Sequence, residues 1–421
     1  MLLNYRSLLR TPTILIKRCY TVPSPYYPIH KSYNTPTSQE PTYPLPPNTY
    51  TQQTPGPNDH IIVAMSSGVD SSVCAALFRQ QYKNVHGIYM ANWSQTAVCT
   101  ERDWRDVQKL CHDLDIDCER VNFEHEYWNE VFLPMIEKYE SGLTPNPDIG
   151  CNKYVKFGKL CEYLEDKYND QKWWLVTGHY ARVMKHNETS EFHLLRGLSQ
   201  RKDQSYYLSS IPSKVLSRVL LPIGHYTKPE IRQLAQEFKL HTASKPDSQG
   251  LCFVNPDQSN FRDFLGDYIQ DKPGDIVTED GKVWGKHRGL WHATIGQRSS
   301  VSMPQGNPEY TGVWFVSEKN FEKNQLIIVK GGDNPKLFKQ TVEIINLEWI
   351  YPKEKVLTME NLQFQHHSLS KSTPVKKITD LGDDRLKIEL ETPVRALAPG
   401  QAGILYNDNQ VLGGGMMIKT T

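Results

Sequence analysis

Residues 60–65 (HIIVAM) and the seven that follow, 66–72 (SSGVDSS), decide the fold of this chain. The first six form a short apolar, β-rich run, which is typical of a buried parallel strand. A strand, a turn of small residues and a helix start bring backbone N–H groups and the positive helix end together where a phosphate can bind. The serines and the aspartate of the turn can also act as ordinary helix caps, so the motif alone leaves both interpretations open.

Strands and helices continue to alternate after this turn, which predicts a doubly wound parallel α/β sheet. The elements that we expect next are strands at 85–90, 116–123 and 173–177 and a helix at 101–114. Ligands of such sheets bind beyond the carboxyl ends of the strands, so Met90, Gly178 and His179 should lie near the first turn. That turn lacks the Lys-Ser/Thr ending of kinase and GTPase P-loops, which excludes that class.

The N-terminal region differs in composition from the rest. Residues 1–39 contain no acidic residue and five basic ones, interleaved with leucine and isoleucine, which is typical of a mitochondrial transit peptide. An ordinary frayed terminus is the alternative. Residues 21–57 hold ten prolines and predict a linker without a core, so we assign 1–57 to transit peptide and linker. No run is long and apolar enough for a membrane span, and eight cysteines without a C-x-x-C pair suit a reduced compartment.

The remaining residues carry 43 basic and 46 acidic side chains (48 minus five, and 47 minus one), so a nucleic-acid partner would need a local basic surface. We expect an α/β domain at 58–252, a small linking domain at 253–312 and a β-barrel at 313–421, where short strands alternate with turns. Residues 281–298 interleave lysine and arginine with two tryptophans, a pattern that suits RNA phosphates and bases, although a solvated face explains it equally well.

Two further turns each contain a cysteine. Residues 144–152 (TPNPDIGCN) present Asp148 and Cys151 on a proline-stiffened loop before an amphipathic helix, and a helix start stabilises a thiolate. Residues 245–253 (KPDSQGLCF) end close to Cys252, with Lys245 near enough in sequence to lower the pKa of that thiol. Each turn could equally be a structural loop with an incidental cysteine.

Taken together, these motifs resemble one family. The strings SSGVDSS, TPNPDIGCNKYVKFG, TGHYAR, KDQSYYLSS, KPDSQGLCF and APGQAGILY occur in this order. The first resembles the pyrophosphate loop of N-type ATP pyrophosphatases, and the whole series resembles the tRNA-specific 2-thiouridylases in their mitochondrial form. The resemblance covers about residues 58–421. One departure is Ser67, where the family pattern has glycine; a side chain there should be tolerated if φ stays negative.

The resemblance implies roles for individual residues. It implies ATP binding by Ala64, Met65, Ser66, Ser67, Gly68, Val69, Asp70, Ser71, Met90 and Gly178. It implies tRNA binding by Asn146, Pro147, Asp148, His179, Lys202, Asp203, Gln204 and Gln401. It also implies that Cys252 carries a persulfide, that Cys151 is the nucleophile or resolving thiol, and that Asp148 is a general acid or base, with no resident metal. A further arginine-tyrosine contact of the family falls poorly on His366-His367, which we leave out.

The implied reaction is physically reasonable. ATP, bound with Mg²⁺, adenylates O2 of the wobble uridine in tRNAs for Lys, Glu and Gln, and sulfur from the persulfide then replaces that oxygen. Cys151 either frees sulfide from the persulfide or closes a disulfide with Cys252. The base has to leave the anticodon stack to react. The implied partners are the tRNA anticodon stem-loop and a persulfide donor or relay protein of a cysteine desulfurase system, in the mitochondrial matrix and without a membrane.

Two rival functions remain open. Another ATP pyrophosphatase, such as an amidating synthetase, would consume a nitrogen source and would not need Cys151. A tRNA-binding protein with weakened catalysis is suggested by Ser67, and would bind tRNA without ATP-dependent release of AMP.

Overall fold

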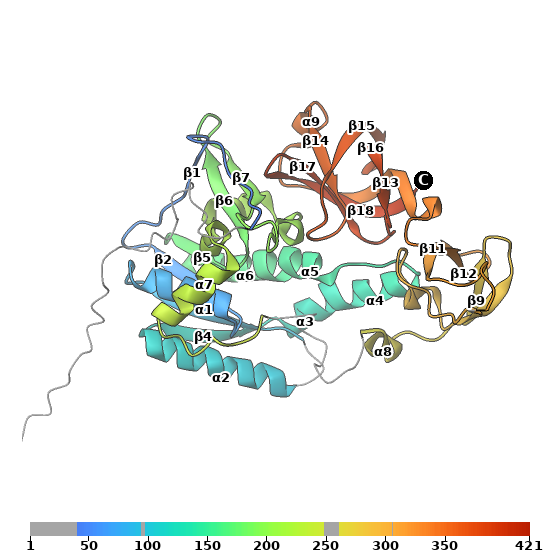
Figure 1. Ribbon diagram of the computed structural model, residues 1–421. Coiled ribbons are helices and arrows are strands. Elements are labelled where there is room, and N and C mark those ends of the chain that lie inside the picture. Colours follow the sequence, from blue (N-terminus) through green and yellow to red (C-terminus); the bar gives the residue numbers. More distant parts are fainter. Residues whose placement is uncertain (1–39, 94–96, 248–260, 305) are drawn as a thin grey trace, which may run out of the picture.

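The computed structural model describes residues 40–93, 97–247, 261–304 and 306–421. Its strands form three sheets, which Figure 1 shows as an α/β unit, a smaller β-rich unit and a C-terminal barrel above the helices that join them. Cys252 and the predicted transit segment 1–39 lie outside the described residues. In the described part, no helix combines the length and the apolar character needed to cross a bilayer.

The α/β unit is built on a five-stranded parallel sheet with strand order β4-β3-β2-β5-β8. The bounds are β2 His60–Met65, β3 Val85–Ala91, β4 Asp117–Asn122, β5 Trp173–Val176 and β8 Val219–Leu220. The chain builds the sheet outward in one direction from β2 to β4 and then returns to the other side with β5. This arrangement confirms the predicted doubly wound sheet, and the reversal between β2 and β5 marks the place where such sheets bind ligands.

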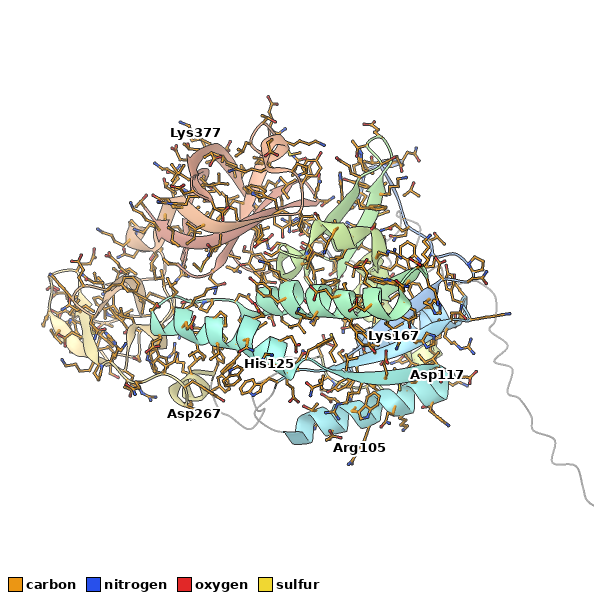
Figure 2. The ribbon with its side chains drawn as sticks, turned by 180° about the vertical axis from the view of Figure 1, so that it is seen from behind. Arg105, Asp117, His125, Lys167, Asp267 and Lys377 are labelled. Atoms are coloured by element: carbon orange, nitrogen blue, oxygen red, sulfur yellow. The ribbon has the colours of Figure 1, made fainter. Side chains whose placement is uncertain are left out.

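Helices cover both faces of this sheet. Helices α1 (Val69–Arg79), α2 (Ala97–Leu114) and α7 (Lys228–Glu237) share one apolar cluster with one set of strand side chains. The other face packs on a helical run made of α5 (Pro147–Gly150), the π-helix η2 (Cys151–Lys159) and α6 (Leu160–Tyr168). Seen from behind, α2 with Arg105 and α6 with Lys167 lie on opposite sides of the strand that begins at Asp117 (Figure 2).

Shorter elements connect these layers. They are α3 (Glu124–Tyr127), η1 (Trp128–Phe132), α4 (Leu133–Glu140), η3 (Ser205–Leu208), η4 (Ser213–Arg218) and η5 (Pro222–His225). The π-helix of η2 depends on Gly158, because a Cβ at this position would lie 2.8 Å from the carbonyl oxygen of Lys153, five residues earlier.

The central unit is larger than the sequence predicts. Helix α8 (Phe261–Gly266) precedes a sheet of order β10-β9-β12-β11, with β9 Gly274–Thr278, β10 Val283–His287, β11 Trp314–Asn320 and β12 Gln325–Lys330. The short helix η6 (Leu290–His292) follows β10. We expected 314–330 to belong to the barrel, but β12 pairs in parallel with β9. The predicted boundary at residue 312 is therefore wrong, because isolated short strands do not reveal their partners.

The C-terminal unit is a closed antiparallel barrel, as predicted. Strands β13 to β18 pair in the order β18-β13-β16-β15-β14-β17, and β17 pairs back with β18. Their bounds are β13 Phe338–Trp349, β14 Leu362–Gln365, β15 Thr373–Gly382, β16 Arg385–Arg395, β17 Ala402–Asn407 and β18 Gln410–Thr420, with η7 (Pro335–Leu337) and α9 (Lys353–Val356) between them. Strands β14 and β15 were not expected from the sequence.

A hairpin of the α/β unit extends this barrel sheet, and an N-terminal segment covers the hairpin. The hairpin is β6 (Ala181–His186) and β7 (Phe192–Arg196), and β1 (Tyr50–Thr51) pairs with β6. Leu45 is buried against Met184 and Leu195. Residues 40–57 are therefore packed on the fold, and the prediction that they form a linker without a core is wrong: their apolar side chains are few but well placed.

We expect a chain that starts at residue 58 to be less stable than one that starts at residue 40. The shorter chain loses the burial of Leu45, and truncating one buried leucine to alanine alone costs about 2–5 kcal/mol. Thermal unfolding of the two chains, together with the full-length variant Leu45→Ala, checks this. Equal unfolding midpoints for all three would show that the segment contributes nothing.

Candidate active site

The turn after β2 carries the residues predicted to bind phosphate, and we call residues 66–72 the cradle. Gly68 is the N-cap of α1 and makes no side-chain cap, so amides of the first turn remain available to an anion. The serines fold the turn: the Ser71 hydroxyl accepts from the Ser66 amide (3.2 Å), and the Ser72 hydroxyl donates to the Gly68 carbonyl (2.8 Å). The geometry suits a phosphate at the positive end of α1.

Ser67 adopts the conformation that glycine favours. Its φ is +59°, so the condition under which we expected a side chain to be tolerated does not hold. The left-handed conformation costs a non-glycine residue on the order of 1 kcal/mol. Two contacts compensate: the Ser67 hydroxyl donates to Asp103 of α2 (2.9 Å), and Lys245 donates to the Ser67 carbonyl (3.2 Å). The side chain is thus engaged with α2 and Lys245.

Asp70, the second residue of α1, holds a cluster of charges that the sequence did not reveal. Its carboxylate accepts from the Tyr180 hydroxyl (2.8 Å), and the Lys228 ammonium donates to both carboxylate oxygens (2.8 and 2.9 Å). Lys228 also pairs with Asp247 at 3.0 Å. The only sequence signal was the string TKPEIR at 227–232, whose lysine and arginine lie four residues apart on one helical face.

Gly178 touches the cradle directly. A Cβ on Gly178 would lie 2.9 Å from the backbone nitrogen of Ser71 and 3.1 Å from the carbonyl carbon of Asp70. The end of β5 therefore approaches the start of α1 as closely as a backbone can. The predicted ATP residues belong to two apolar clusters on opposite faces of the parallel sheet. Ala64 and Met90 pack on the face covered by η2, whereas Met65 and Val69 pack in the cluster that contains α1.

His179 connects the cradle to the cysteine-bearing helix. Its Nδ1 lies 2.7 Å from the Thr177 hydroxyl, and its ring centroid lies 5.8 Å from that of Phe157 in η2. Burial, aided by the positive charge of Lys156, holds the pKa of His179 well below its usual range. The imidazole is therefore neutral at physiological pH and can exchange hydrogen bonds without carrying charge.

The second predicted turn positions Asp148 and Cys151. The Asn146 side chain accepts from the Asp148 amide (3.0 Å) and starts α5, with Pro147 in the first helical position. Cys151 is 4% exposed at the start of η2, three residues after Asp148, so the two share a helical face. Burial raises the pKa of Asp148, with Lys156 opposing the shift, as expected for a carboxyl group that exchanges protons.

Asn152 is a neighbouring polar group that the sequence analysis missed. It is 2% exposed, and its amide donates to the Tyr207 carbonyl (3.0 Å). Its Oδ1 is buried and has no hydrogen-bond partner among the described residues. A buried acceptor without a partner is costly unless a ligand satisfies it.

All three units meet at this turn. The Thr144 backbone amide donates to the Pro399 carbonyl (3.0 Å), and the Gln401 side-chain amide donates through Nε2 to the Thr144 carbonyl (2.8 Å). Gly400, with φ of +96°, leaves no room for a Cβ, which would lie 2.3 Å from the Thr144 nitrogen. Thr294 of the central unit lies 3.4 Å away, hydroxyl to hydroxyl. Gln401, predicted to contact tRNA, connects the barrel to this turn by a hydrogen bond.

The three residues predicted to bind tRNA together, Lys202, Asp203 and Gln204, have different partners in the structure. Lys202 pairs with Asp247 at 2.8 Å. Asp203 is buried, and its carboxylate accepts from the Arg196 guanidinium (3.1 Å) and the Ser205 hydroxyl (2.9 Å). Gln204 accepts from the Tyr180 amide (2.9 Å). Contacts of these three residues with tRNA remain predictions.

In the basic and aromatic stretch 281–298, most of the charged side chains have partners within the central unit. Lys282 lies 4.3 Å from the ring centroid of Trp284, and Lys286 and Arg288 pair with acids at 2.5 and 2.9 Å. Arg298 lines a cavity of about 310 Å³ in the same unit. His366 is buried, which lowers its pKa to about 4. Among the described residues of this stretch, Thr294 contacts the turn at 144–148, whereas no hydrogen bond or ion pair joins these charged groups to it.

Lys319 of β11 supports the loop before the turn. Its ammonium is buried and donates to the Gly142 carbonyl (2.6 Å). Desolvation lowers the pKa of Lys319 to about 7. Gly142 is also closely packed against β11 and the residue that follows it: a Cβ on Gly142 would lie 2.8 Å from the ring of Phe321.

For the cradle, we expect Gly178→Ala to weaken ATP binding at least tenfold, because the added methyl has to displace the backbone of residues 70–71. Gly306→Ala is the matched control, since nothing lies within 4 Å of a Cβ there. Calorimetric titration with ATP measures both. Unchanged affinity in the Gly178 variant would contradict the assignment of this edge to the nucleotide.

For the loop, we expect Lys319→Met to stabilise the fold at low pH. The unfolded lysine has a pKa of about 10.4, so between pH 7 and 10.4 the unfolded state holds a proton that the folded state lacks, and wild-type stability rises with pH. Below pH 7 the folded state carries the full penalty, on the order of 4 kcal/mol for the shift to about 7. The gain in unfolding midpoint should therefore be large at pH 6 and shrink toward pH 10.

Exposed Lys323→Met, a few residues along, is the control and should show no such trend. A Lys319→Met gain that is independent of pH would show that packing, and not charge burial, sets the difference.

Comparisons with known proteins agree with this geometry. Three family models match the chain: tRNA methyl transferase HUP domain at 59–256, tRNA methyl transferase PRC-barrel domain at 262–330 and aminomethyltransferase beta-barrel domain at 339–417. The chain is 50% identical over 386 residues to mitochondrial tRNA-specific 2-thiouridylase 1 of Saccharomyces cerevisiae, covering 86% of this chain and 93% of that protein.

Two more distant relatives bear similar names. Mitochondrial tRNA-specific 2-thiouridylase 1 of Schizosaccharomyces pombe is 38% identical, covering 88% of this chain and 93% of that protein. The tRNA-specific 2-thiouridylase MnmA of Lactiplantibacillus plantarum is 40% identical, covering 86% of this chain and 95% of that protein. With full-length relatives at this identity and family models over all three units, the chain belongs to the tRNA-specific 2-thiouridylase family.

Proposed function

We propose that this chain is an ATP-dependent tRNA sulfurtransferase that converts the wobble uridine of mitochondrial tRNAs, those for Lys, Glu and Gln, to 2-thiouridine. One observation carries the proposal. Asp148 and Cys151 stand at the start of a helical run whose neighbour His179 directly follows Gly178, and Gly178 touches the phosphate cradle. The residues that we assign to adenylation and the thiol that we assign to sulfur transfer are therefore carried by neighbouring elements.

The first step activates the base. O2 of the uracil attacks the α-phosphorus of Mg²⁺-bound ATP, the bond to the β-phosphate breaks and pyrophosphate leaves. The base loses its N3 proton as O2 becomes an ester. Asp148 is suited to take this proton, because burial raises its pKa toward the working range of a general base.

The second step replaces oxygen by sulfur. The outer sulfur of a persulfide on Cys252 attacks C2, and AMP leaves with the former O2. The Cys151 thiolate then attacks the Cys252 sulfur, which releases the 2-thiouridine and forms a Cys151–Cys252 disulfide that a thiol reductant reopens. In the alternative order, Cys151 attacks the persulfide first and frees sulfide, which then attacks C2.

The chain's own groups suit the recognition of a flipped base. Asn152 offers a buried, unsatisfied acceptor next to Cys151, which can receive uracil N3–H as the base enters, before Asp148 takes that proton. Neutral His179 and the amide of Asn146 are uncharged partners for a neutral base. Asn146, Pro147 and Asp148 lie where the barrel, the central unit and the α/β unit converge, so an anticodon stem-loop could contact all three units at once.

Location and sulfur supply follow from relatives and composition. The two yeast relatives are named mitochondrial, and residues 1–39 have the composition of a transit peptide. We therefore place the protein in the mitochondrial matrix. The sulfur donor is a persulfide-carrying protein fed by a cysteine desulfurase, because the chemistry needs sulfane sulfur.

The test is direct thiolation in vitro. Purified full-length chain is incubated with tRNA transcript, Mg²⁺-ATP, cysteine and a cysteine desulfurase, and the tRNA is resolved on a mercury-containing gel. We expect a retarded band and AMP release. Cys151→Ser and Cys252→Ser should abolish the band, while Cys118→Ser, a half-buried cysteine of β4, should keep it.

Asp148→Asn should reduce the rate by about 10²–10⁴ while tRNA affinity is retained, as expected for a lost general base. An unretarded band with wild-type chain and a donor of proven activity would overturn the proposal. A product containing nitrogen in place of oxygen would favour an amidating synthetase instead.

A further inference from the structure

A short N-terminal segment pairs with the loop that carries three of the predicted tRNA contacts. We call residues 41–45 the strap; the loop is residues 198–204, whose last three are the triplet predicted to bind tRNA. Strap and loop run antiparallel, with a bridge between Thr42 and Ser199. Backbone hydrogen bonds flank this bridge on both sides: from the Tyr43 amide to the Leu198 carbonyl (2.8 Å) and from the Gln200 amide to the Pro41 carbonyl (3.1 Å). The first half of the loop is therefore fixed to the strap.

Side chains of two other segments also hold the strap. Arg182 of β6 donates to the Tyr43 carbonyl (2.8 Å). Asn409, between β17 and β18 of the barrel, donates to the Pro44 carbonyl (2.7 Å). Leu45 is buried against the hairpin β6–β7. The strap therefore joins the loop to the hairpin and to the barrel at once.

The Tyr43 ring contacts the ion pair that closes the loop. The Cζ of Arg196 lies 4.9 Å from the ring centroid of Tyr43, and the same guanidinium pairs with Asp203 at 3.1 Å. A cation over an aromatic face is attracted to it, and the attraction is stronger away from water. The Asp203 carboxylate also accepts from the Gly197 amide (2.9 Å) and the Ser205 amide (3.1 Å), one on each side of the loop. Tyr43 thus supports the group that holds both ends of the loop.

Attachment of the N-terminal segment does not require these contacts. Strand β1 pairs with β6 and Leu45 is buried on the hairpin, so residues 45–51 are held without residues 41–44. The polar contacts of residues 41–44 go instead to the loop, to Arg182 and to the barrel. A loop that presents several side chains to a large substrate binds it better when its conformation is fixed beforehand, because less freedom is then lost on binding.

We propose that the strap positions the 198–204 loop for tRNA, with Tyr43 as a positioning residue of the thiolation reaction, and that the strap remains part of the working enzyme. This inference rests on the proposed function, in which Lys202, Asp203 and Gln204 contact tRNA. Among the described residues, no hydrogen bond or ion pair joins the strap to the cradle. Loss of the strap should therefore change tRNA binding and leave ATP binding intact.

The test is steady-state thiolation by the full-length chain with tRNA transcript as the varied substrate, at saturating Mg²⁺-ATP, cysteine and desulfurase. We expect Tyr43→Ala to raise the KM for tRNA at least fivefold and to change kcat and ATP affinity less than twofold. Tyr43→Phe keeps a ring over Arg196 and should stay within twofold of wild type. Thr49→Ala, whose hydroxyl bonds to the nearby Pro47 carbonyl (3.5 Å), is the matched control and should change neither constant.

The split between KM and kcat separates positioning from stability. If Tyr43 only stabilised the fold, its loss would lower the amount of active enzyme and hence the apparent kcat, with the KM for tRNA unchanged. That result would overturn the inference. Equal losses of tRNA and ATP affinity would overturn it as well, because they would show a general loosening of the α/β unit.

Gln200→Ala examines the same pairing from the side of the loop. The Gln200 side chain donates to the Thr42 carbonyl (3.0 Å), so its removal weakens the pairing and leaves the strap sequence intact. We expect the KM for tRNA to rise two- to fivefold. This variant keeps the test decisive if Tyr43→Ala fails to fold, as checked by circular dichroism, and an unchanged KM in Gln200→Ala would then overturn the inference.

The N-terminus of the natural protein gives a second readout. The predicted transit segment ends at residue 39, and pairing with the loop begins at Pro41. Mass spectrometry of the protein isolated from mitochondria should therefore find a first residue at or before Pro41, and a first residue beyond it would overturn the inference.

Failure of this inference can be told apart from failure of the proposed function. A wild-type chain that is absent from mitochondria, or that does not thiolate tRNA, would overturn the proposed function itself. Normal thiolation by the wild-type chain together with silent strap variants would overturn the inference alone.

Discussion

The buried guanidinium of Arg196 is the contact on which the relative placement of the α/β unit and the barrel depends. It pairs with Asp203 at 3.1 Å, donates to Gln365 of the barrel at 2.8 Å, and its Cζ lies 3.7 Å from the ring centroid of Tyr406 and 4.9 Å from that of Tyr43. An unpaired buried charge costs several kcal/mol, about 3–5 when one partner of a buried pair is removed. The three segments that supply these partners are therefore bound to one another, and the N-terminal segment is one of them.

This constraint explains what the sequence could and could not predict. Residues 60–65 and the alternation after them predicted the parallel sheet, because a strand buried on both faces has a local, apolar signature. The position of 40–57 was not predictable, since its attachment depends on Tyr43 and Leu45 meeting a hairpin more than 130 residues away. The boundary at 312 failed for the same reason: β12 finds β9 only through tertiary pairing.

In the candidate site, too, local sequence signals were predictable and contacts between distant residues were not. Local motifs predicted the cradle, Asp148 and Cys151 as site residues, because the end of a strand or a stiff turn fixes where these residues lie. Lys228, Asn152 and Lys319 were missed, since each gains its meaning from a neighbour distant in sequence: Asp70, Tyr207 and Gly142, respectively. The left-handed backbone of Ser67 was also missed, and the residues that contact Ser67 there, Asp103 and Lys245, are distant in sequence.

The turn at 144–148 is held in place by contacts with all three units. Its carbonyl and amide at Thr144 are held by the barrel, its approach at Gly142 by the central unit, and its helix by the α/β unit. A catalytic group contributes most when its position is fixed before substrate binds, since freedom lost during binding reduces the useful energy. The barrel and the central unit therefore hold the backbone of this turn at Thr144 and Gly142, and so help to fix the positions of Asp148 and Cys151.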